Sequence, residues 1–412
     1  MKKKKKTMDT IRISKSHHGS HHKYCGRAAA AIILMLILAL LTGCGSASGA
    51  GSGSQSANEP VTGENYYLDT ICTISVYAMR ADQNSSADDN AASDVIAASE
   101  DEERANAAIK VAFDLCAALD KKLSRTQAAS EISKVNSAGG EWTEASEDTL
   151  ELVRAGKRYS ELSGGDFDIT IGGVTDLWDF HADPEDAELP DASAVREAVK
   201  HVDYNNIEIN GNKLRITDPD TRIDLGGIAK GYIGDRMTEV LEEQGVTSGI
   251  INLGGNVICI GGKYTGGSNT VKDNAAASES SGGDDTAGYD DFVIGVEAPF
   301  SDRTEIVGKL RGRDKTFVTS GVYERKIEVD GKLYHHILST KTGCSVDTDL
   351  DAVTLAGDKG KSMDLDALST ICLIKGSKEA KKLIEKTDGV EAVFILHDGS
   401  IDQTSGMEFE AE

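Results

Sequence analysis

The chain has 412 residues, of which 39% are hydrophobic, so it is long enough for one large domain or two small ones with a sizeable core. Its 68 acidic and 44 basic residues give a formal net charge of −24 at pH 7. We therefore expect no nucleic-acid partner, because such a chain repels a polyanion. Phosphate groups of a small ligand can still bind, but they need local devices such as a metal ion or a helix N-terminus.

The N-terminal segment has the layout of an export signal. Basic residues from Lys2 to Arg27 precede an apolar run, residues 28–41, that is too short to span a bilayer comfortably. The run ends in Leu41-Thr42-Gly43-Cys44, which resembles the lipobox of bacterial lipoproteins. Residues 1–43 are therefore predicted to be a lipoprotein signal peptide, with Cys44 the lipid-bearing (palmitate) first residue of the mature chain. A plain cleaved signal or a short anchor is the alternative, and either one implies export.

Residues 44–65 are predicted to be a flexible tether, because Gly, Ser and Ala make up almost all of residues 45–56. The folded part is predicted to cover residues 66–412. The cysteines show neither the spacing of a zinc site nor a dense disulfide framework. Besides the lipid site, buried thiols are expected at Cys25, Cys72, Cys116, Cys259, Cys344 and Cys372.

Strands and helices alternate irregularly along the folded part. In chain order we expect a β-branched strand, a solvated low-complexity insertion and two amphipathic helices, at 66–78, 81–103, 109–123 and 146–163. A helix up to residue 199, two short strands and a helix entered from a glycine turn follow, at 207–209, 214–216 and 228–244. A second low-complexity insertion, expected to be a disordered surface loop, covers 264–290. Beyond it lie strands at 291–297, 326–329, 352–356 and 392–396 and helices at 366–375 and 377–387. Without strict βαβ alternation, this order favours an α+β fold with mixed sheets and packed helices.

The segment from Arg222 to Tyr232, RIDLGGIAKGY, is the most informative part of the chain. It reads as the end of a strand that enters a helix through paired glycines. Glycines allow close backbone approach to a ligand, the helix start favours an anion, and Lys230 adds a positive charge. From these residues alone, a phosphate site and an ordinary packing turn are equally good interpretations.

As a set, the motifs resemble those of the ApbE family of FAD:protein FMN transferases. DLGGIAKGY resembles the central motif of that family, and six further blocks occur in the family's order. They are SEISKVN (130–136), GDFDIT with LW (165–178), NLGGN (252–256), TSG with YER (319–325), HHI before KTG (335–343) and DALST (366–370). The resemblance extends from about residue 66 to the C-terminus and implies an ApbE-like flavin transferase fold over 66–412.

Asp366 and Thr370 lie four residues apart at the start of a predicted helix, so their oxygens face the same way and can ligate one hard cation such as Mg²⁺. The resemblance implies that a backbone carbonyl at Gly227 completes the metal site and that Ser369 supports it. The alternative is an N-capping Asp366 with Thr370 facing solvent.

The resemblance also implies where FAD binds. It places FAD across the Asp166-Phe167-Asp168 block and the turn from Asp224 to Lys230, with Phe167 packing on a ring. The implied contacts are Leu68, Thr126 or its neighbour Arg125, Asp166, Phe167, Asp168, Asp224, Lys230 and Leu338. For Trp178 we favour ordinary core packing.

The implied reaction is attack by a Ser or Thr hydroxyl of a target protein on the FMN-side phosphorus of FAD, with AMP as the leaving group. Such a transfer needs a metal ion to neutralise phosphate oxygens and a base to accept the hydroxyl proton. His336 is the candidate base, since the unperturbed pKa of histidine suits this task. A carboxylate near the metal is the competing candidate.

The chain departs from the family at one place. Members commonly read HIIDPKTG, whereas this chain has Ser339-Thr340 where the family has Asp-Pro. If that Asp were the base, activity would be lost here. Because Asp366, Thr370 and the DLGGIAKG turn are intact, a working enzyme is expected.

The sequence therefore predicts a lipid-anchored flavinyl transferase on the extracytoplasmic face of the cell membrane. By resemblance, its acceptors are membrane-linked redox subunits of ion-pumping or electron-transfer systems. One alternative is a metal-dependent FAD pyrophosphatase, in which water replaces the acceptor. Another is a flavin-binding lipoprotein without chemistry. A solute-binding lipoprotein would show two similar lobes, and the sequence has no such repeat.

Overall fold

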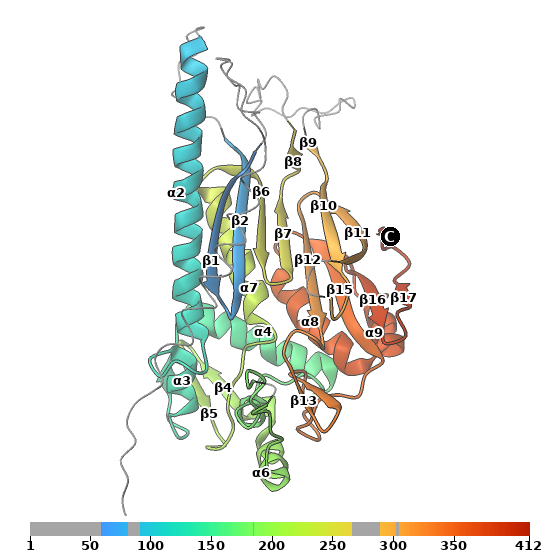
Figure 1. Ribbon diagram of the computed structural model, residues 1–412. Helices are drawn as coiled ribbons and strands as arrows, with labels where there is room; N and C mark the ends of the chain where they lie inside the picture. The colour runs from blue at the N-terminus through green and yellow to red at the C-terminus, as the bar shows by residue number, and fades with distance from the viewer. Residues whose placement is uncertain (1–58, 81–90, 184, 266–288, 302–304) are drawn as a thin grey trace, which may run out of the picture. The chain divides into compact units, whose positions relative to one another are not determined.

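The computed structural model describes residues 59–80, 91–183, 185–265, 289–301 and 305–412, without the side chains of 91–99 (Figure 1). The predicted signal peptide, Cys25, Cys44, most of the tether and most of segment 264–290 lie outside these residues. Within the described ranges, no helix combines the length and the apolar character needed to cross a bilayer.

An eight-stranded sheet organises the described chain, and every neighbouring pair of its strands is antiparallel. In spatial order its strands are β1 (Val61–Tyr67), β2 (Thr70–Met79), β6 (Val246–Leu253), β7 (Asn256–Ile260), β12 (Lys315–Gly321), β15 (Leu350–Asp358), β16 (Glu391–Leu396) and β17 (Ile401–Gln403).

Four smaller sheets accompany the large one. A three-stranded sheet contains β10 (Phe292–Glu297), β11 (Ile306–Gly312) and β18 (Phe409–Ala411), and another contains β3 (Thr143–Glu144), β5 (Lys213–Ile216) and β4 (Ile207–Asn210). The two-stranded ladders are β13 (Lys326–Val329) with β14 (Lys332–His335) and β8 (Lys263–Tyr264) with β9 (Tyr289–Asp290).

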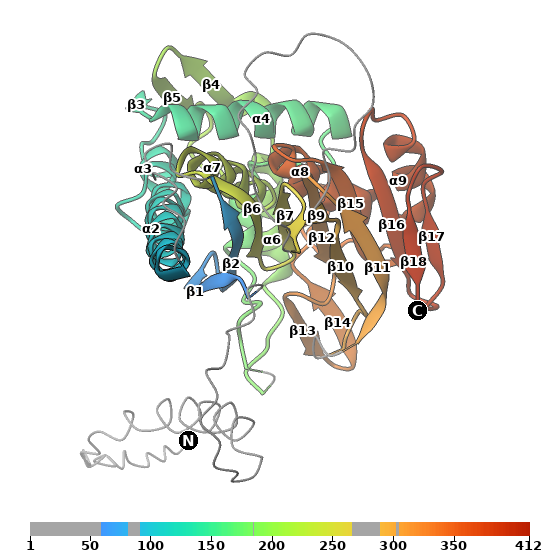
Figure 2. The ribbon, with the colours of Figure 1, turned by 90° about the horizontal axis from the view of Figure 1, so that it is seen from above.

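Helices cover one face of the large sheet, and the β10–β11–β18 sheet covers the other (Figure 2). Successive side chains of β7 point to opposite faces of the large sheet. Ile258 belongs to the core under the helices, whereas Cys259 belongs to the core between the two sheets. The helices are α2 (Ala91–Leu123), α3 (Glu131–Asn136), α4 (Glu147–Ser163), α5 (Gly172–Thr175), α6 (Ala192–Ala198), α7 (Ala229–Glu243), α8 (Ser362–Lys375) and α9 (Ser377–Ile384), with 3₁₀ turns at Val199–His201 and Tyr204–Asn206.

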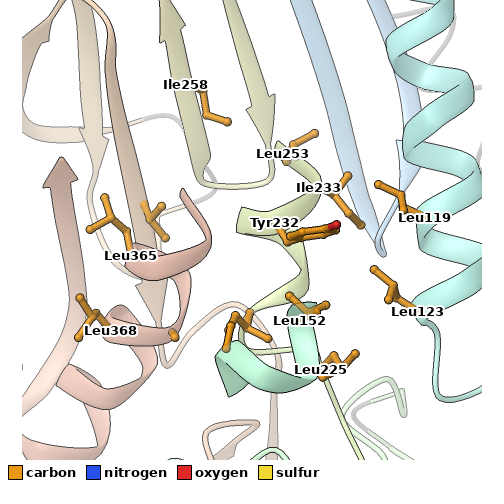
Figure 3. Close-up of a cluster of buried hydrophobic side chains, with 14 of the residues drawn as sticks. Leu119, Leu123, Leu152, Leu225, Tyr232, Ile233, Leu253, Ile258, Leu365 and Leu368 are labelled. Atoms are coloured by element: carbon orange, nitrogen blue, oxygen red, sulfur yellow. The ribbon is translucent and has the colours of Figure 1, made fainter. Parts of the chain in front are cut away.

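The main core lies where α7 packs between the sheet, α2, α4 and α8 (Figure 3). Tyr232 and Ile233 of α7 meet Leu119 of α2 and Leu253 of β6 in this layer. Tyr232 is buried, and its hydroxyl donates a 2.8 Å hydrogen bond to Asp148 of α4. The apolar face of α7 therefore fixes the helix that carries the DLGGIAKGY motif.

The α+β prediction is confirmed, and several predicted elements differ in detail. The strand predicted at 66–78 is a hairpin, because Leu68 and Asp69 both adopt positive φ (55° and 58°) and reverse the chain between β1 and β2. Since β1 begins at Val61, the folded part starts before residue 66.

The helix predicted at 109–123 is longer than expected, and one predicted thiol is exposed. Helix α2 begins at Ala91, so residues 91–103 of the expected insertion are helical, as their content of Ala and Glu permits. Four cysteines are buried as predicted, namely Cys72, Cys116, Cys259 and Cys372. Cys344 is exposed, because it lies in the loop after β14.

Candidate functional site

The first turn of α7 meets α8 at a very close crossing. A Cβ atom at Gly231 would overlap the carbonyl oxygen of Ser362, so only glycine permits this approach. Because the helices touch here, the N–H of Gly231 donates a 2.9 Å hydrogen bond to Oδ2 of Asp366. The glycine of the AKGY motif thus connects the motif to the acidic residue of DALST.

Asp366 lies in the second turn of α8 and is only 2% exposed. It is therefore not a helix N-cap, and that alternative from the sequence is wrong. Burial raises the pKa of this carboxyl, while the charge of Lys230 opposes the rise. No side-chain cation among the described residues lies within hydrogen-bond distance of Asp366, and such a buried carboxylate is costly unless a positive ligand joins it.

Thr370 and Gly227 lie side by side next to this carboxylate. A Cβ atom at Gly227 would come within 3.6 Å of Thr370 Oγ1 and 2.9 Å of the Phe167 ring. Thr370 is half-buried and lies one helical turn after Asp366. The oxygen donors of Asp366, Thr370 and the Gly227 region suit a hard divalent cation such as Mg²⁺. We call Gly227, Lys230, Asp366 and Thr370 the Asp366 centre.

Ser369 supports this centre from the sheet side. Its hydroxyl donates a 2.8 Å hydrogen bond to the carbonyl of Asp366, and it lies 2.8 Å from Ser320 Oγ. Since the Ser369 proton is used on Asp366, Ser320 is the donor between the two hydroxyls. The TSG block of β12 thereby holds the helical turn that carries Asp366 and Thr370.

The two blocks expected to contact FAD are neighbours. Ile169 accepts a 2.7 Å hydrogen bond from the N–H of Asp224, so the Asp166-Phe167-Asp168 block lies beside the DLGG segment. Within the described part of the chain, this segment makes only an isolated bridge, Ile171 with Arg222, and is not the strand that the sequence predicted. Asn136 of SEISKVN holds that segment at Ile223, with Nδ2 donating at 2.9 Å and Oδ1 accepting at 2.7 Å. This block is therefore a structural brace of the glycine turn.

Three of the expected FAD residues have protein partners already. Asp168 is buried, and its two oxygens accept from Thr170 and from the N–H of Tyr204, so it serves the fold. Asp224 forms a 3.0 Å ion pair with Arg125. Thr126 is close to Ser124, with 3.1 Å between the two hydroxyls.

Two titratable residues that follow other elements lie within reach of the charge of Lys230. Its charge acts on Glu324, which follows β12, and on His336, which follows β14. Part of Glu324 is exposed to solvent. The protein around its carboxylate nevertheless desolvates it, and this raises its pKa. His336 is half-buried; desolvation first, and then the charge of Arg325, lower its pKa to about 3. The imidazole is therefore neutral at physiological pH, and its pKa is not the unperturbed one assumed from the sequence.

The hairpin turn of β1 and β2 closes another side of this region. Asp69 lies 3.6 Å from the guanidinium of Arg325, which places its half-buried neighbour Leu68 at the same end of the sheet. Thr70 packs against Gly254 of the NLGGN turn. These contacts place Leu68, which the resemblance expects to contact FAD, at the hairpin end that meets Arg325 and the NLGGN turn.

Ser339 and Thr340, which replace the Asp-Pro of the family, form a turn. Ser339 Oγ accepts 3.2 Å hydrogen bonds from the N–H groups of Lys341 and Thr342, as an Asp side chain commonly does in turns. Thr340 Oγ1 donates a 2.7 Å hydrogen bond to the carbonyl of Gly165. The replacement thus keeps a turn-capping acceptor at this position.

Asp166 lines an open cavity of about 760 Å³ beside that turn. Although burial acts in the opposite direction, hydrogen bonds from Lys341 (2.8 Å) and Lys375 (3.0 Å) hold the pKa of Asp166 below its ordinary value. Asp166 is therefore ionised and paired with two lysines. Any FAD contact there involves the lysines as well as the carboxylate.

A second cavity, of about 650 Å³, lies between α6, the β13–β14 hairpin and the loop after it. Trp178 and His335 line this cavity, and neither it nor the cavity at Asp166 is lined by Asp366 or Lys230. Trp178 is buried and donates a 2.9 Å hydrogen bond to Gly343, so its predicted packing role is confirmed. Leu338 belongs to the same apolar cluster, and its side chain packs in the core.

Within the described chain, His201, Asp218 and Asp220 form another group that could surround a cation. His201 Nδ1 lies 2.8 Å from Asp218 Oδ2, and that pairing accounts for the group.

Comparison with known proteins identifies the family of this chain. The profile of the ApbE family matches residues 68–394, which is well over half of the chain. The chain belongs to the ApbE family. Two curated relatives named FAD:protein FMN transferase are each 28% identical to it: one from Treponema pallidum over 73% of this chain and 80% of its own length, and one from Klebsiella pneumoniae over 70% and 82%.

Solved ApbE structures share the fold. The ApbE protein from Thermotoga maritima superposes with a TM-score of 0.66 at 26% identity, covering 84% of this chain and 97% of its own. The flavin transferase ApbE from Vibrio cholerae gives 0.63 at 21% identity and covers 84% and 98%. The prediction of a transferase with an ApbE fold is therefore confirmed.

Sequence reasoning missed three residues that the ApbE fold brings to the Asp366 centre. Gly231 and Glu324 stand inside quoted motifs, yet their roles depend on helix crossing and loop placement. Asn256 ends the NLGGN motif and is completely buried. A polar residue that opens an otherwise apolar strand, Asn256-Val257-Ile258-Cys259-Ile260, was the available signal.

Proposed function

We propose that this protein is a metal-dependent FAD:protein FMN transferase that acts outside the cytoplasm. The observation that carries the proposal is the Asp366 centre. It combines a buried carboxylate, a hydroxyl one turn away and a lysine at the start of a helix. The names of the curated ApbE relatives support FAD as the donor substrate.

The reaction moves the FMN phosphoryl group from AMP to a protein hydroxyl. The acceptor oxygen forms a bond to the FMN-side phosphorus, the bond between that phosphorus and the AMP oxygen breaks, and the hydroxyl proton passes to a base. Lys230 and the start of α7 hold phosphate oxygens by charge. A divalent cation bound at Asp366 and Thr370 would neutralise charge on the phosphates.

Two residues beside Lys230 compete for the role of base. His336 is neutral and can accept a proton, and the negative phosphates of bound FAD would raise its low pKa toward a useful range. Glu324 has a pKa raised by desolvation, which also makes it a better base than an ordinary carboxylate. We assign the base to His336 and keep Glu324 as the competitor.

The test is transfer of FMN to an acceptor protein. The purified enzyme is incubated with FAD, Mg²⁺ and a candidate acceptor, and the acceptor is weighed by mass spectrometry. We expect the mass of one FMN adduct with release of AMP. Free FMN and AMP without an adduct would instead identify a pyrophosphatase, and unchanged FAD would identify a binding protein.

His336→Gln and Glu324→Gln, assayed in parallel, identify the base. The variant that lacks the base should lose about 10²–10⁴-fold in transfer rate. The other should keep most of it. An equal, small loss in both would remove His336 and Glu324 from this role.

We also propose that the enzyme is lipid-anchored through Cys44 on the extracytoplasmic face of the cell membrane and that its acceptors are membrane-linked redox subunits. The lipobox-like LTGC and the Gly/Ser-rich segment behind it support the anchor. A tethered enzyme would reach acceptor hydroxyls close to the membrane surface.

A further inference from the structure

Asn256 occupies a position that the backbone fixes on both sides. It opens β7 directly after the two-residue turn Gly254-Gly255, in which both glycines have positive φ (59° and 100°). Asn256 is paired with Leu253 across the β6 ladder and with Val318 across the β12 ladder. The direction of its side chain is therefore set by the pleat of the sheet.

That side chain faces α8 at the level of Asp366. Val318, its partner on β12, lies between Thr316 and Ser320, which hydrogen-bond to Ser362 and Ser369 of α8. Cross-strand partners present their side chains on the same face of a sheet. Asn256 must therefore point between those two contacts on α8.

Asp366 is the polar residue that α8 places there. Ser362, Asp366 and Ser369 share one side of the helix, because they are four and three residues apart. The Asn256 amide is close enough to stabilise the ionised form of Asp366 electrostatically, although the two groups do not reach hydrogen-bond geometry.

The amide itself is unsatisfied. Asn256 is 0% exposed, and neither Nδ2 nor Oδ1 has a hydrogen-bond partner within the described part of the chain. Leaving such a group unpaired costs about 1–3 kcal/mol. Asn136 shows the contrasting case, in which both amide atoms bond the backbone of Ile223.

We propose that Asn256 is a positioning residue of the metal site, with Nδ2 orienting the Asp366 carboxylate and Oδ1 accepting from a water that accompanies the cation. This inference rests on the proposed metal-dependent function. Residues that orient a metal ligand through hydrogen bonds typically contribute 10–100-fold to metal affinity. A purely structural Asn would be expected to satisfy its own amide, as Asn136 does.

The experiment compares Asn256→Ala with Asn136→Ala in the full-length protein. Binding of Mn²⁺, a substitute for Mg²⁺, is titrated by electron paramagnetic resonance, and the melting midpoint is measured in EDTA. For Asn256→Ala we expect Mn²⁺ affinity to fall about 10–100-fold while the melting midpoint in EDTA stays within a few degrees of wild type. For Asn136→Ala we expect the reverse, a lower midpoint with Mn²⁺ affinity kept.

Activity gives an independent measure. The Mg²⁺ concentration that half-saturates FMN transfer should rise by a similar factor in Asn256→Ala, and excess Mg²⁺ should restore the rate. Wild-type Mn²⁺ affinity in Asn256→Ala, or a midpoint in EDTA as low as that of Asn136→Ala, overturns the positioning role and leaves the proposed function intact. A wild-type protein that neither binds Mn²⁺ nor transfers FMN overturns the proposed function itself.

Discussion

The backbone N–H of Gly231 and Oδ2 of Asp366 are 2.9 Å apart, and this hydrogen bond exists only because glycine lets α7 touch α8. The contact joins the start of α7, proposed to bind phosphate, to the helix of the proposed metal site. Their relative position is therefore fixed by the close crossing of α7 and α8 at Gly231.

Replacing Gly231 with alanine should separate the two helices. The new Cβ would overlap the backbone at Ser362, which cannot move without shifting α8. We expect a loss of about 1–3 kcal/mol in the free energy of unfolding, together with most of the FMN transfer. Urea unfolding measures the loss of stability, and the transfer assay measures the loss of activity. Gly173→Ala is the control, since a Cβ there meets its nearest neighbour at an ordinary 3.6 Å; equal effects in both variants would refute the argument.

Asp366→Asn and Thr370→Ala should abolish metal-supported transfer without unfolding the protein. Each removes an oxygen ligand, so we expect transfer to fall more than about 100-fold at fixed Mg²⁺. In EDTA, Asp366→Asn should melt no lower than wild type, because it removes a buried charge. The remote Thr387→Ala serves as control. Full transfer by Asp366→Asn would place the metal elsewhere.

Asp235 of α7 should make stability depend on pH. Its carboxylate accepts the N–H groups of Ser362 (3.1 Å) and Met363 (2.9 Å), yet burial raises its pKa from 3.8 to about 6. The folded state therefore holds this proton more tightly than the unfolded state does. The resulting stabilisation is complete below about pH 4 and is lost as the pH rises through about 6.

The measurement is the free energy of unfolding of wild type minus that of Asp235→Asn, from pH 3.5 to 8. We expect the difference to fall by roughly 3 kcal/mol between about pH 4 and 6 and to stay level above pH 7. Carboxyl groups whose pKa values are lowered in the folded state occur in both proteins, so their contributions cancel in this difference. A difference that rises with pH would mean that the two N–H donors outweigh burial.

Ser339 should matter for the turn and not for proton transfer. Ser339→Ala removes the acceptor of two N–H groups, so about 0.5–1.5 kcal/mol of stability should be lost. The transfer rate should change by no more than about twofold, or roughly 0.5 kcal/mol. Ser339→Asp, which restores the residue common in the family, should keep both properties. A large gain in rate with Ser339→Asp would show that this position supplies a base.

Cys44→Ser should release the enzyme from the membrane. Fractionation of cells and labelling with a palmitate analogue measure the anchor, and transfer to a soluble acceptor measures catalysis. We expect the variant in the soluble exported fraction, unlabelled, with transfer kept, because the described fold begins after residue 58. Membrane retention without label would point to the uncleaved segment 28–41 as the anchor.

Local sequence patterns predicted the elements whose formation depends mainly on their own residues. Helices α4, α7 and α9 and strands β4 and β5 follow from periodicity and flanking turn residues. The hairpin at Leu68-Asp69 escaped because neither residue is a glycine, although both adopt positive φ. Strands β6 and β7 escaped because their apolar runs lack the alternation of a half-buried strand.

The site was predictable as a set of motifs but not as a geometry. Gly227 and Thr370 lie together as the resemblance implied. Asp168 and Leu338, which the resemblance expects to contact FAD, also stabilise the fold: Asp168 accepts hydrogen bonds, and Leu338 packs in an apolar cluster. Which polar residue serves a ligand and which serves its neighbours depends on tertiary contacts that motifs do not encode.

The short β8–β9 ladder has a practical consequence. Lys263 pairs with Asp290 and Tyr264 with Tyr289, while Arg313 donates a 2.9 Å hydrogen bond to the carbonyl of Tyr289. The two described ends of the chain around residues 266–288 are thus held side by side. Because closing a longer loop adds little free energy, the length between these ends can change with little effect on β7 or β10. An affinity tag or fluorescent reporter inserted there would give experimenters a handle on the intact enzyme.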